Sequence, residues 1–130
     1  MARTFLIVAA LFTLALSAAP VGAASILEGT WSGTGYVQPR DGQRERVTCK
    51  VVYRQLNPTV HSVKATCATA SMKIIQTGEL STVREGRYIG DLANLQYKIF
   101  GRVRVIVQGN NQNVTFTSEA GEGTLALKRR

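Results

Sequence analysis

The pattern of apolar and polar residues changes at about residue 24. Before that point the chain is almost uniformly apolar, and after it short runs with a period of two alternate with turn residues. A period of two is typical of a β-strand with one buried face. The pattern predicts strands over residues 30–38, 44–56, 61–68, 71–80, 85–91, 96–108, 113–118 and 123–129. Eight strands with short connections favour an all-β fold, a small antiparallel up-and-down barrel, because closure removes the edges of the sheet; a β-sandwich is the alternative.

The two cysteines allow a check on the pairing of two of these strands. Cys49 and Cys67 lie on the apolar faces of the runs 44–56 and 61–68, and each is nine residues from Pro58 in the turn between them. A hairpin centred on this turn places the two side chains opposite each other, within reach of a disulfide. The sequence therefore predicts a Cys49–Cys67 bond that contributes about 3 kcal/mol to stability and is typical of an oxidising compartment.

Residues 1–24 have the three parts of a cleavable secretory signal. Arg3 supplies the positive start, residues 5–19 are apolar, and small residues precede Ala24. The apolar stretch is shorter than the roughly 20 residues that cross a bilayer, although a retained anchor is the alternative. We expect cleavage near residue 24, a single all-β domain over residues 25–130 without a transmembrane anchor, and a periplasmic or secreted location.

The chain is basic, with 16 lysines and arginines against 8 acidic residues and a formal net charge of +8. The basic residues expected on outward strand faces form a candidate anion-binding face: Lys50, Arg54, Lys64, Lys98, Arg102 and Arg104. Basic residues next to an aromatic such as Phe100 can bind nucleic acid, but no nucleic acid is expected for an exported protein. The expected partner is an anionic component of the cell envelope or an acidic protein, and a merely solvated face is the alternative.

Few residues suit catalysis or metal binding. His61 is the single histidine, and its place beside the Pro58 turn predicts a solvated side chain. The cysteines are assigned to the disulfide, so zinc would lack ligands, and a Ser-His-Asp triad would need this one histidine. The acidic residues are scattered and mostly in turns. We expect no catalytic residue, metal or cofactor, and the oligomeric state stays open.

The segment Gly29-Thr30-Trp31 resembles the Gly-x-Trp signature of calycin barrels, the group of lipocalins, avidins and some bacterial protease inhibitors. In that group the tryptophan closes one end of the barrel and a basic side chain from the last strand lies across it. The resemblance implies this role for Trp31 with Lys128 or Arg129. The stretch from Trp31 to Gly35, followed by Arg46-Val47-Thr48-Cys49, is also similar to small exported β proteins of alphaproteobacteria.

These observations predict an exported, non-enzymatic binding protein of the bacterial cell envelope that uses a basic outer face or the mouth of the barrel. Inhibition of a protease or lysozyme and binding of a small ligand, as in calycins, are the alternatives. An internal cavity would favour the small ligand, and a filled interior would favour surface binding. The residues expected to line such a cavity are Val47, Val51, Tyr53, Tyr97 and Val105.

Overall fold

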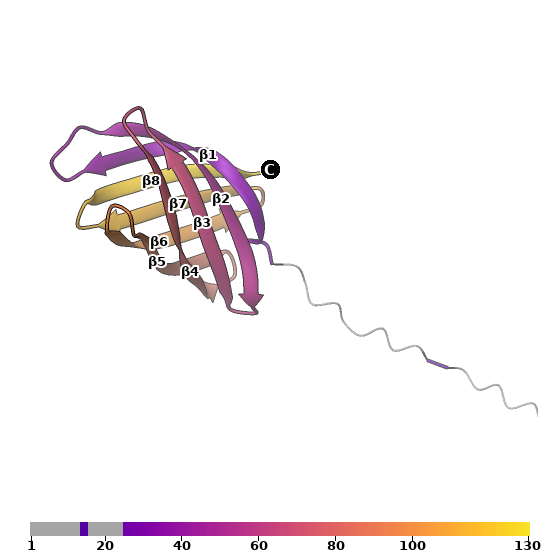
Figure 1. The fold of residues 1–130 in the computed structure, drawn as a ribbon. Coiled ribbons are helices and arrows are strands. Elements are labelled where there is room, and N and C mark those ends of the chain that lie inside the picture. The colour runs from indigo at the N-terminus through magenta and orange to yellow at the C-terminus, as the bar shows by residue number, and fades with distance from the viewer. Residues whose placement is uncertain (1–13, 16–24) are drawn as a thin grey trace, which may run out of the picture.

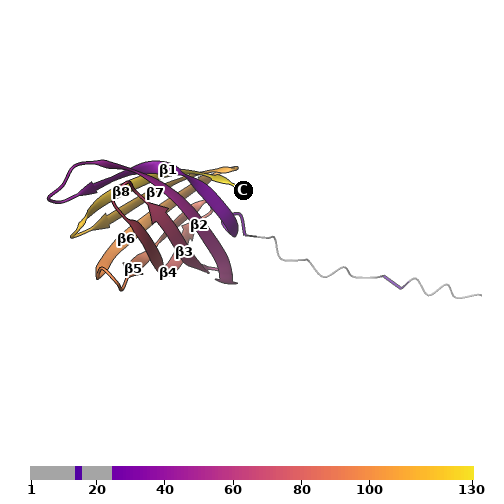
Figure 2. The ribbon, with the colours of Figure 1, turned by 45° about the horizontal axis from the view of Figure 1, so that its top comes forward.

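The computed structural model describes residues 14–15 and 25–130, so nearly all of the predicted secretory signal lies outside the described residues. From residue 25 the chain forms eight strands: β1 (Gly29–Pro39), β2 (Glu45–Asn57), β3 (Val60–Ala68), β4 (Lys73–Arg84), β5 (Arg87–Asn94), β6 (Ile99–Gln108), β7 (Asn111–Ser118) and β8 (Gly121–Arg129). Each strand pairs antiparallel with the next, and β8 pairs with β1 (Figures 1 and 2). The predicted eight-stranded up-and-down barrel is confirmed, and the sandwich is excluded.

The alternation of side chains explains which face of each strand is buried. On β2, Val47, Cys49, Val51 and Tyr53 point into the barrel and are buried, whereas Lys50 is exposed. The same alternation on the other strands builds one apolar core inside the closed sheet. None of the described residues forms a helix that is long and apolar enough to cross a membrane.

Two turns lie elsewhere than the sequence pattern predicts. Strand β4 continues through Ser81, Thr82 and Val83 to Arg84, because the chain turns at residues 85–86, where Gly86 has a φ of 76°. Strand β6 begins at Ile99 and not at residue 96, since residues 95–98 form a turn in which Lys98 has a φ of 52°. Residues 97 and 98 were predicted to extend a strand, and this prediction is wrong.

The connections define two different ends of the barrel. Residues 40–44, 69–72, 95–98 and 119–120 join successive strand pairs at one end, which we call the open end. The N-terminal segment 25–28 and the C-terminus lie at the other end, which we call the closed end. In Figure 1 the open end is at the left and the closed end, with the C-terminus, is at the right.

The β2–β3 hairpin has the register predicted from its cysteines. Cys49 and Cys67 are paired directly across the two strands, their Cα atoms are 4.1 Å apart, and their sulfurs are bonded. The predicted disulfide is confirmed. Disulfides persist in oxidising compartments, so this bond indicates an environment outside the cytoplasm.

Inward glycines allow the closest approach of neighbouring strands. A Cβ atom at Gly35 of β1 would lie 1.8 Å from the carbonyl oxygen of Thr124 on β8. On the opposite side of the barrel, a Cβ atom at Gly90 of β5 would lie 1.9 Å from the carbonyl oxygen of Glu79 on β4. The sheet therefore bends sharply at two places where only glycine fits, which helps eight strands to close.

Candidate functional site

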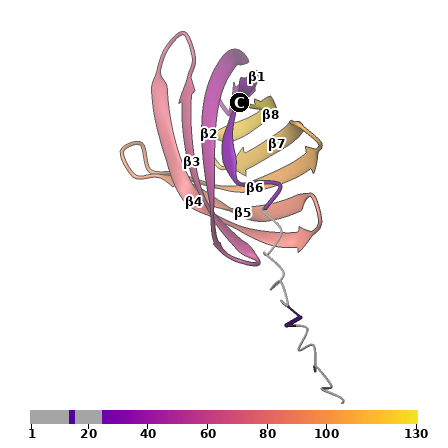
Figure 3. The same cartoon turned by 90° about the vertical axis from the view of Figure 1, so that its right-hand side faces the viewer.

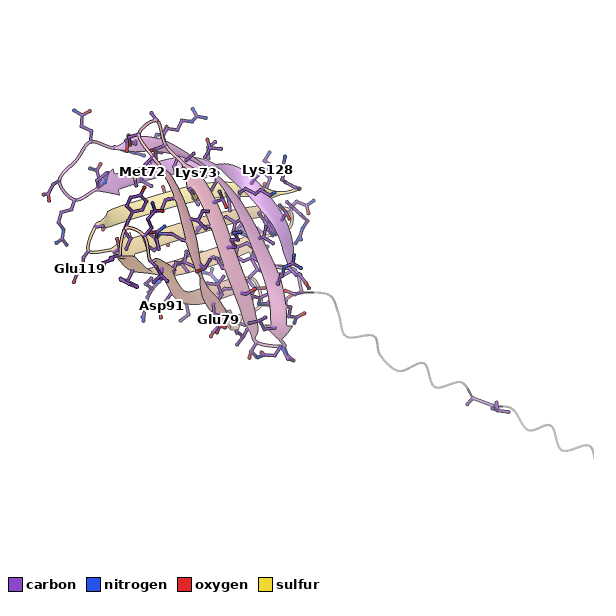
Figure 4. All side chains as sticks on the ribbon, in the orientation of Figure 1. Met72, Lys73, Glu79, Asp91, Glu119 and Lys128 are labelled. Carbon is purple, nitrogen blue, oxygen red and sulfur yellow. A yellow bond between two sulfur atoms is a disulfide. The ribbon has the colours of Figure 1, made fainter. Side chains whose placement is uncertain are left out.

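The closed end is sealed around a tryptophan. Trp31 is fully buried, and its Nε1 donates a hydrogen bond of 2.9 Å to the carbonyl oxygen of Leu27. The Arg129 guanidinium lies 4.3 Å from the centre of the indole ring and donates hydrogen bonds to the carbonyls of Glu28 and Ile26. Of the two basic residues predicted to cover the indole, only Arg129 does so. Lys128 points outward, as Figure 4 also shows.

His61 belongs to this seal, and the prediction that it is solvated is wrong. Its side chain is 2% exposed because residue 61 is the second residue of β3 and shares the inward face of Val63 and Ala65. Its Nε2 is hydrogen-bonded to the Ser25 hydroxyl, and its ring packs edge-on against Tyr88 at 5.5 Å between centroids. Burial lowers the pKa of His61, and the Glu28 carboxylate opposes this with a smaller effect. The neutral imidazole therefore acts as a packed core residue at neutral pH.

Two buried polar side chains are hydrogen-bonded to each other across the interior of the barrel. The Tyr53 hydroxyl of β2 donates a hydrogen bond of 2.5 Å to Gln112 Oε1 of β7. Both side chains are buried, and the Gln112 Nε2 has no hydrogen-bond partner among the described residues. Burial raises the pKa of the Tyr53 hydroxyl well above its usual value, so the phenol stays protonated.

The open end contains a cavity of about 320 Å³ between the inner faces of the strands. Its walls are mainly apolar, with Val47, Ile74, Val114, Phe116 and Leu125 contributed by four different strands. Polar lining groups come mostly from strand ends and the adjoining loops. They include Glu45, Thr69, Ser118 and Glu122. The cavity is therefore an apolar space with a polar rim.

The disulfide and the packed core bound this cavity. Cys49 and Cys67 line it, so the bond that fixes the hairpin also forms part of the wall. Val51, Tyr53 and Val105, which were predicted to line a cavity, do not line this one and instead belong to the buried core. Tyr97 lies in the exposed turn 95–98 and also does not line it. Of the five predicted lining residues, only Val47 does.

Two contacts hold the rim in place. The Ser71 hydroxyl donates a hydrogen bond of 2.9 Å to the Glu45 carboxylate, which ties the loop 69–72 to the start of β2. The Arg44 guanidinium lies 4.0 Å from the centre of the Tyr36 ring at the end of β1. These contacts order the side chains that surround the cavity opening.

The six residues of the predicted anion-binding face are not brought together. Lys50 and Arg54 lie on the outside of β2 and Lys64 on the outside of β3. Arg102 and Arg104 lie on the outside of β6, and Lys98 lies in the turn before it. Three strands separate β2 from β6 in both directions around the ring, so the two groups face opposite sides of the barrel. Within the second group, Arg102 forms an exposed ion pair of 3.6 Å with Asp91.

The part of the chain that the structure describes contains no cluster of three or more His, Cys, Asp and Glu side chains suited to a metal ion. Sequence reasoning missed the inward positions of Gln112 and Asn94, which are both buried polar residues. Gln112 could have been found from its alternation with Val114 and Phe116, two and four residues further on.

The fold and site together define a closed eight-stranded β-barrel with one sealed end and one cavity-bearing end. Comparison with protein-family models and with curated proteins found no match. Among solved structures, this chain is similar to a redesigned β-barrel, mFAP1, bound to DFHBI, with a TM-score of 0.65 and 14% identity over 80% of this chain and 94% of that chain. It is also similar to Rv2717c from M. tuberculosis, with a TM-score of 0.60 and 13% identity over 80% of this chain and 92% of that chain. At these identities the similarity is one of fold alone.

Proposed function

We propose that this protein binds a small apolar ligand in the cavity at the open end of its barrel. The observation that carries the proposal is the cavity itself, whose apolar wall residues surround about 320 Å³ of space beneath a polar rim. Small-molecule sites are usually apolar pockets of about 300–1,000 Å³ with a few polar groups that orient the ligand. An apolar protein cavity of about 150 Å³ accommodates benzene, so a cavity of about 320 Å³ suits a ligand of roughly two to three aromatic rings, two of them fused, or an alkyl group of similar bulk.

The asymmetry of the barrel supports a single route into this site. Trp31, Arg129 and the segment 25–28 seal the closed end, and the packed core lies between that seal and the cavity. A ligand therefore enters and leaves past the loops of the open end. The structural neighbour mFAP1, a barrel of the same fold bound to DFHBI, supports the idea that this fold can hold a small molecule.

We further propose that binding occurs without chemistry and outside the cytoplasm. The ionisable side chains that line the cavity among the described residues are Tyr36, Glu45 and Glu122, and no histidine or lysine accompanies them. This set lacks a nucleophile with an adjacent base. The disulfide and the predicted secretory signal support a periplasmic or secreted location in a bacterial envelope.

A titration with the neutral apolar dye N-phenyl-1-naphthylamine tests the proposal, with matched tryptophan substitutions on the two faces of β4. Ile74 lines the cavity, whereas its neighbour Ile75 points outward and is partly exposed. We expect Ile74→Trp to weaken dye binding about tenfold or more by filling the cavity, and Ile75→Trp to leave it unchanged. Leu125→Phe fills the same space from β8, on the opposite wall, and should also weaken binding. Equal affinities for the inward and outward variants, or no saturable dye binding, would overturn the proposal.

A further inference from the structure

Four exposed apolar side chains gather on one side of the open end. They are Leu95 and Tyr97 in the turn 95–98, Phe100 at the start of β6 and Ile75 near the start of β4, which are 78%, 46%, 58% and 43% exposed. We call this set the apolar rim patch. Figure 3 shows the turn, in orange, projecting from the barrel beyond β3 and β4.

A buried asparagine holds the patch together. The Asn94 side-chain amide donates a hydrogen bond of 2.7 Å to the carbonyl oxygen of Ile75, which fixes the turn against β4. Its Oδ1 accepts a hydrogen bond of 2.6 Å from the backbone N–H of Tyr97 inside the turn. Phe100 follows on the outer face of β6, where it is paired with Ala93 of β5. The exposed apolar side chains are thus presented by ordered backbone.

Other exposed apolar residues lie nearer the closed end. Leu56 is the last residue but one of β2 and Val83 lies near the end of β4, so β3 separates their two strands. Single exposed apolar side chains are ordinary on a protein surface, whereas a cluster of them usually marks an interaction site.

Exposed basic residues surround the apolar rim patch. Lys73 starts β4 close to Ile75, and Lys98 lies in the turn between Tyr97 and Phe100. Arg102 and Arg104 continue along the outer face of β6, and the acidic residues on this side are Asp91 of β5, which forms an ion pair with Arg102, and Glu79 of β4, which is paired with Asp91. Other acidic residues of the open end, Glu45, Glu119 and Glu122, belong instead to β2, the β7–β8 turn and β8. In Figure 4, Glu119 marks this acidic side of the open end.

We propose that the apolar rim patch docks the open end of the barrel onto an anionic lipid bilayer. Aliphatic and aromatic side chains at the tip of a turn can enter the region between headgroups and acyl chains, and neighbouring lysines and arginines contact lipid phosphates. Tyr97 suits the boundary between these regions because its ring is apolar and its hydroxyl is polar. An acidic polysaccharide would satisfy the basic residues but would leave the apolar tip without a partner.

Docking in this orientation turns the cavity entrance toward the membrane. The apolar rim patch and the cavity opening share one end of the barrel, and Ile74 of the cavity wall is the neighbour of Ile75 in the patch. An apolar ligand could then pass between bilayer and cavity with little exposure to water. Docking itself does not require a ligand, but this exchange rests on the proposed function.

Co-sedimentation with vesicles tests the docking. The protein is mixed with vesicles of phosphatidylcholine alone or of phosphatidylcholine with phosphatidylglycerol. We expect binding to the anionic vesicles that weakens with added salt, and an affinity lowered about tenfold by Leu95→Ser with Phe100→Ser. The matched control is Leu56→Ser with Val83→Ser, which removes two exposed apolar residues from the closed end and should leave vesicle binding unchanged.

Each other outcome decides against the docking surface. Absence of binding to anionic vesicles overturns it, and so does an equal loss in the control variant. Binding that depends on salt but not on Leu95 and Phe100 also overturns it, because charge alone would then explain the association. Two cross-checks keep this test separate from the cavity: Ile74→Trp should still bind vesicles, and the Leu95→Ser, Phe100→Ser variant should still bind the dye. For the native protein, dye binding without vesicle binding removes only the docking surface, whereas vesicle binding without dye binding removes only the ligand site.

Discussion

Tyr53 and Gln112 form a hydrogen bond that spans the barrel interior from β2 to β7. We consider Tyr53→Phe, which removes only the donor, Gln112→Met, which replaces the amide by an apolar side chain of similar size, and the double substitution. Both residues are buried, so neither partner can turn to bulk water when the other is lost.

The expected costs follow from which polar atoms are left without a partner. Tyr53→Phe leaves Gln112 Oε1 unpaired beside an Nε2 that already lacks a partner among the described residues. An unsatisfied buried polar group costs about 1–3 kcal/mol, so this change should lower the free energy of unfolding by that amount. Gln112→Met leaves the Tyr53 hydroxyl unpaired but removes the orphaned Nε2, so it should cost less. The double substitution replaces both partners by apolar groups and should cost less than the sum of the two.

Urea unfolding of the oxidised protein measures these differences. The single tryptophan, Trp31, is fully buried and reports the transition by fluorescence. We expect a coupling energy of about 1 kcal/mol or more from the double-mutant cycle. Additivity within about 0.5 kcal/mol, or a Tyr53→Phe variant as stable as the native chain, would refute the reasoning.

Three further predictions concern the disulfide, the buried histidine and the strand contact at Gly35. In the Cys49→Ser, Cys67→Ser variant, the free energy of unfolding measured by thermal unfolding should fall by about 3 kcal/mol. The variant should also bind the dye more weakly, because the disulfide forms part of the cavity wall. Equal melting temperatures of the native protein with and without reductant would contradict the first expectation. The free energy of unfolding should fall as the pH drops below about 6.5, because His61 takes up a proton in the unfolded state whereas burial lowers its pKa in the folded state. Urea midpoints measured across this pH range should fall less in the His61→Gln variant. Gly35→Ala should lower the free energy of unfolding by about 3 kcal/mol or prevent folding, because its Cβ would meet the carbonyl oxygen of Thr124. The control Gly123→Ala, whose Cβ would lie 3.4 Å from Val37 Cγ1, should unfold at nearly the native urea midpoint.

The β2–β3 hairpin could be predicted from sequence because two separate signals agree on it. Alternation places both cysteines on apolar faces, and their equal distance from Pro58 sets the register that the structure has. A slip of one residue in either strand would turn its cysteine to the outer face, away from the other cysteine, so the bond and the burial pattern select one pairing.

The turn at residues 95–98 could not be predicted in the same way. The sequence from Asn94 to Ile99 has no glycine or proline, and Tyr97 and Ile99 continue the alternation of the strand that follows. The turn depends on the Asn94 side chain, which accepts a local hydrogen bond from the Tyr97 N–H but is held against β4 by its bond to the Ile75 carbonyl. That second bond is a tertiary contact and leaves no local pattern. For the same reason the sequence pattern does not reveal the apolar rim patch.

The cavity also depends on information that alternation does not carry. Val47 and Val51 share the inward face of β2 and are both buried, yet only Val47 lines the cavity. The difference arises from the tilt of the strands and from the close approach of the walls at inward glycines, which fix where the interior is filled. The place of His61 beside a turn predicts a solvated side chain, but its spacing of two residues from Val63 puts it on the inward face of β3.

Methyl NMR spectra recorded with and without N-phenyl-1-naphthylamine test the central claim most directly. We predict saturable shifts at the methyl groups of Val47, Val114 and Leu125, which line the cavity, and unchanged signals from Val83 and Ile89 on the outer surface. Shifts confined to the outer methyl groups, or cavity signals that stay in place at saturating dye, would contradict a ligand site inside the barrel.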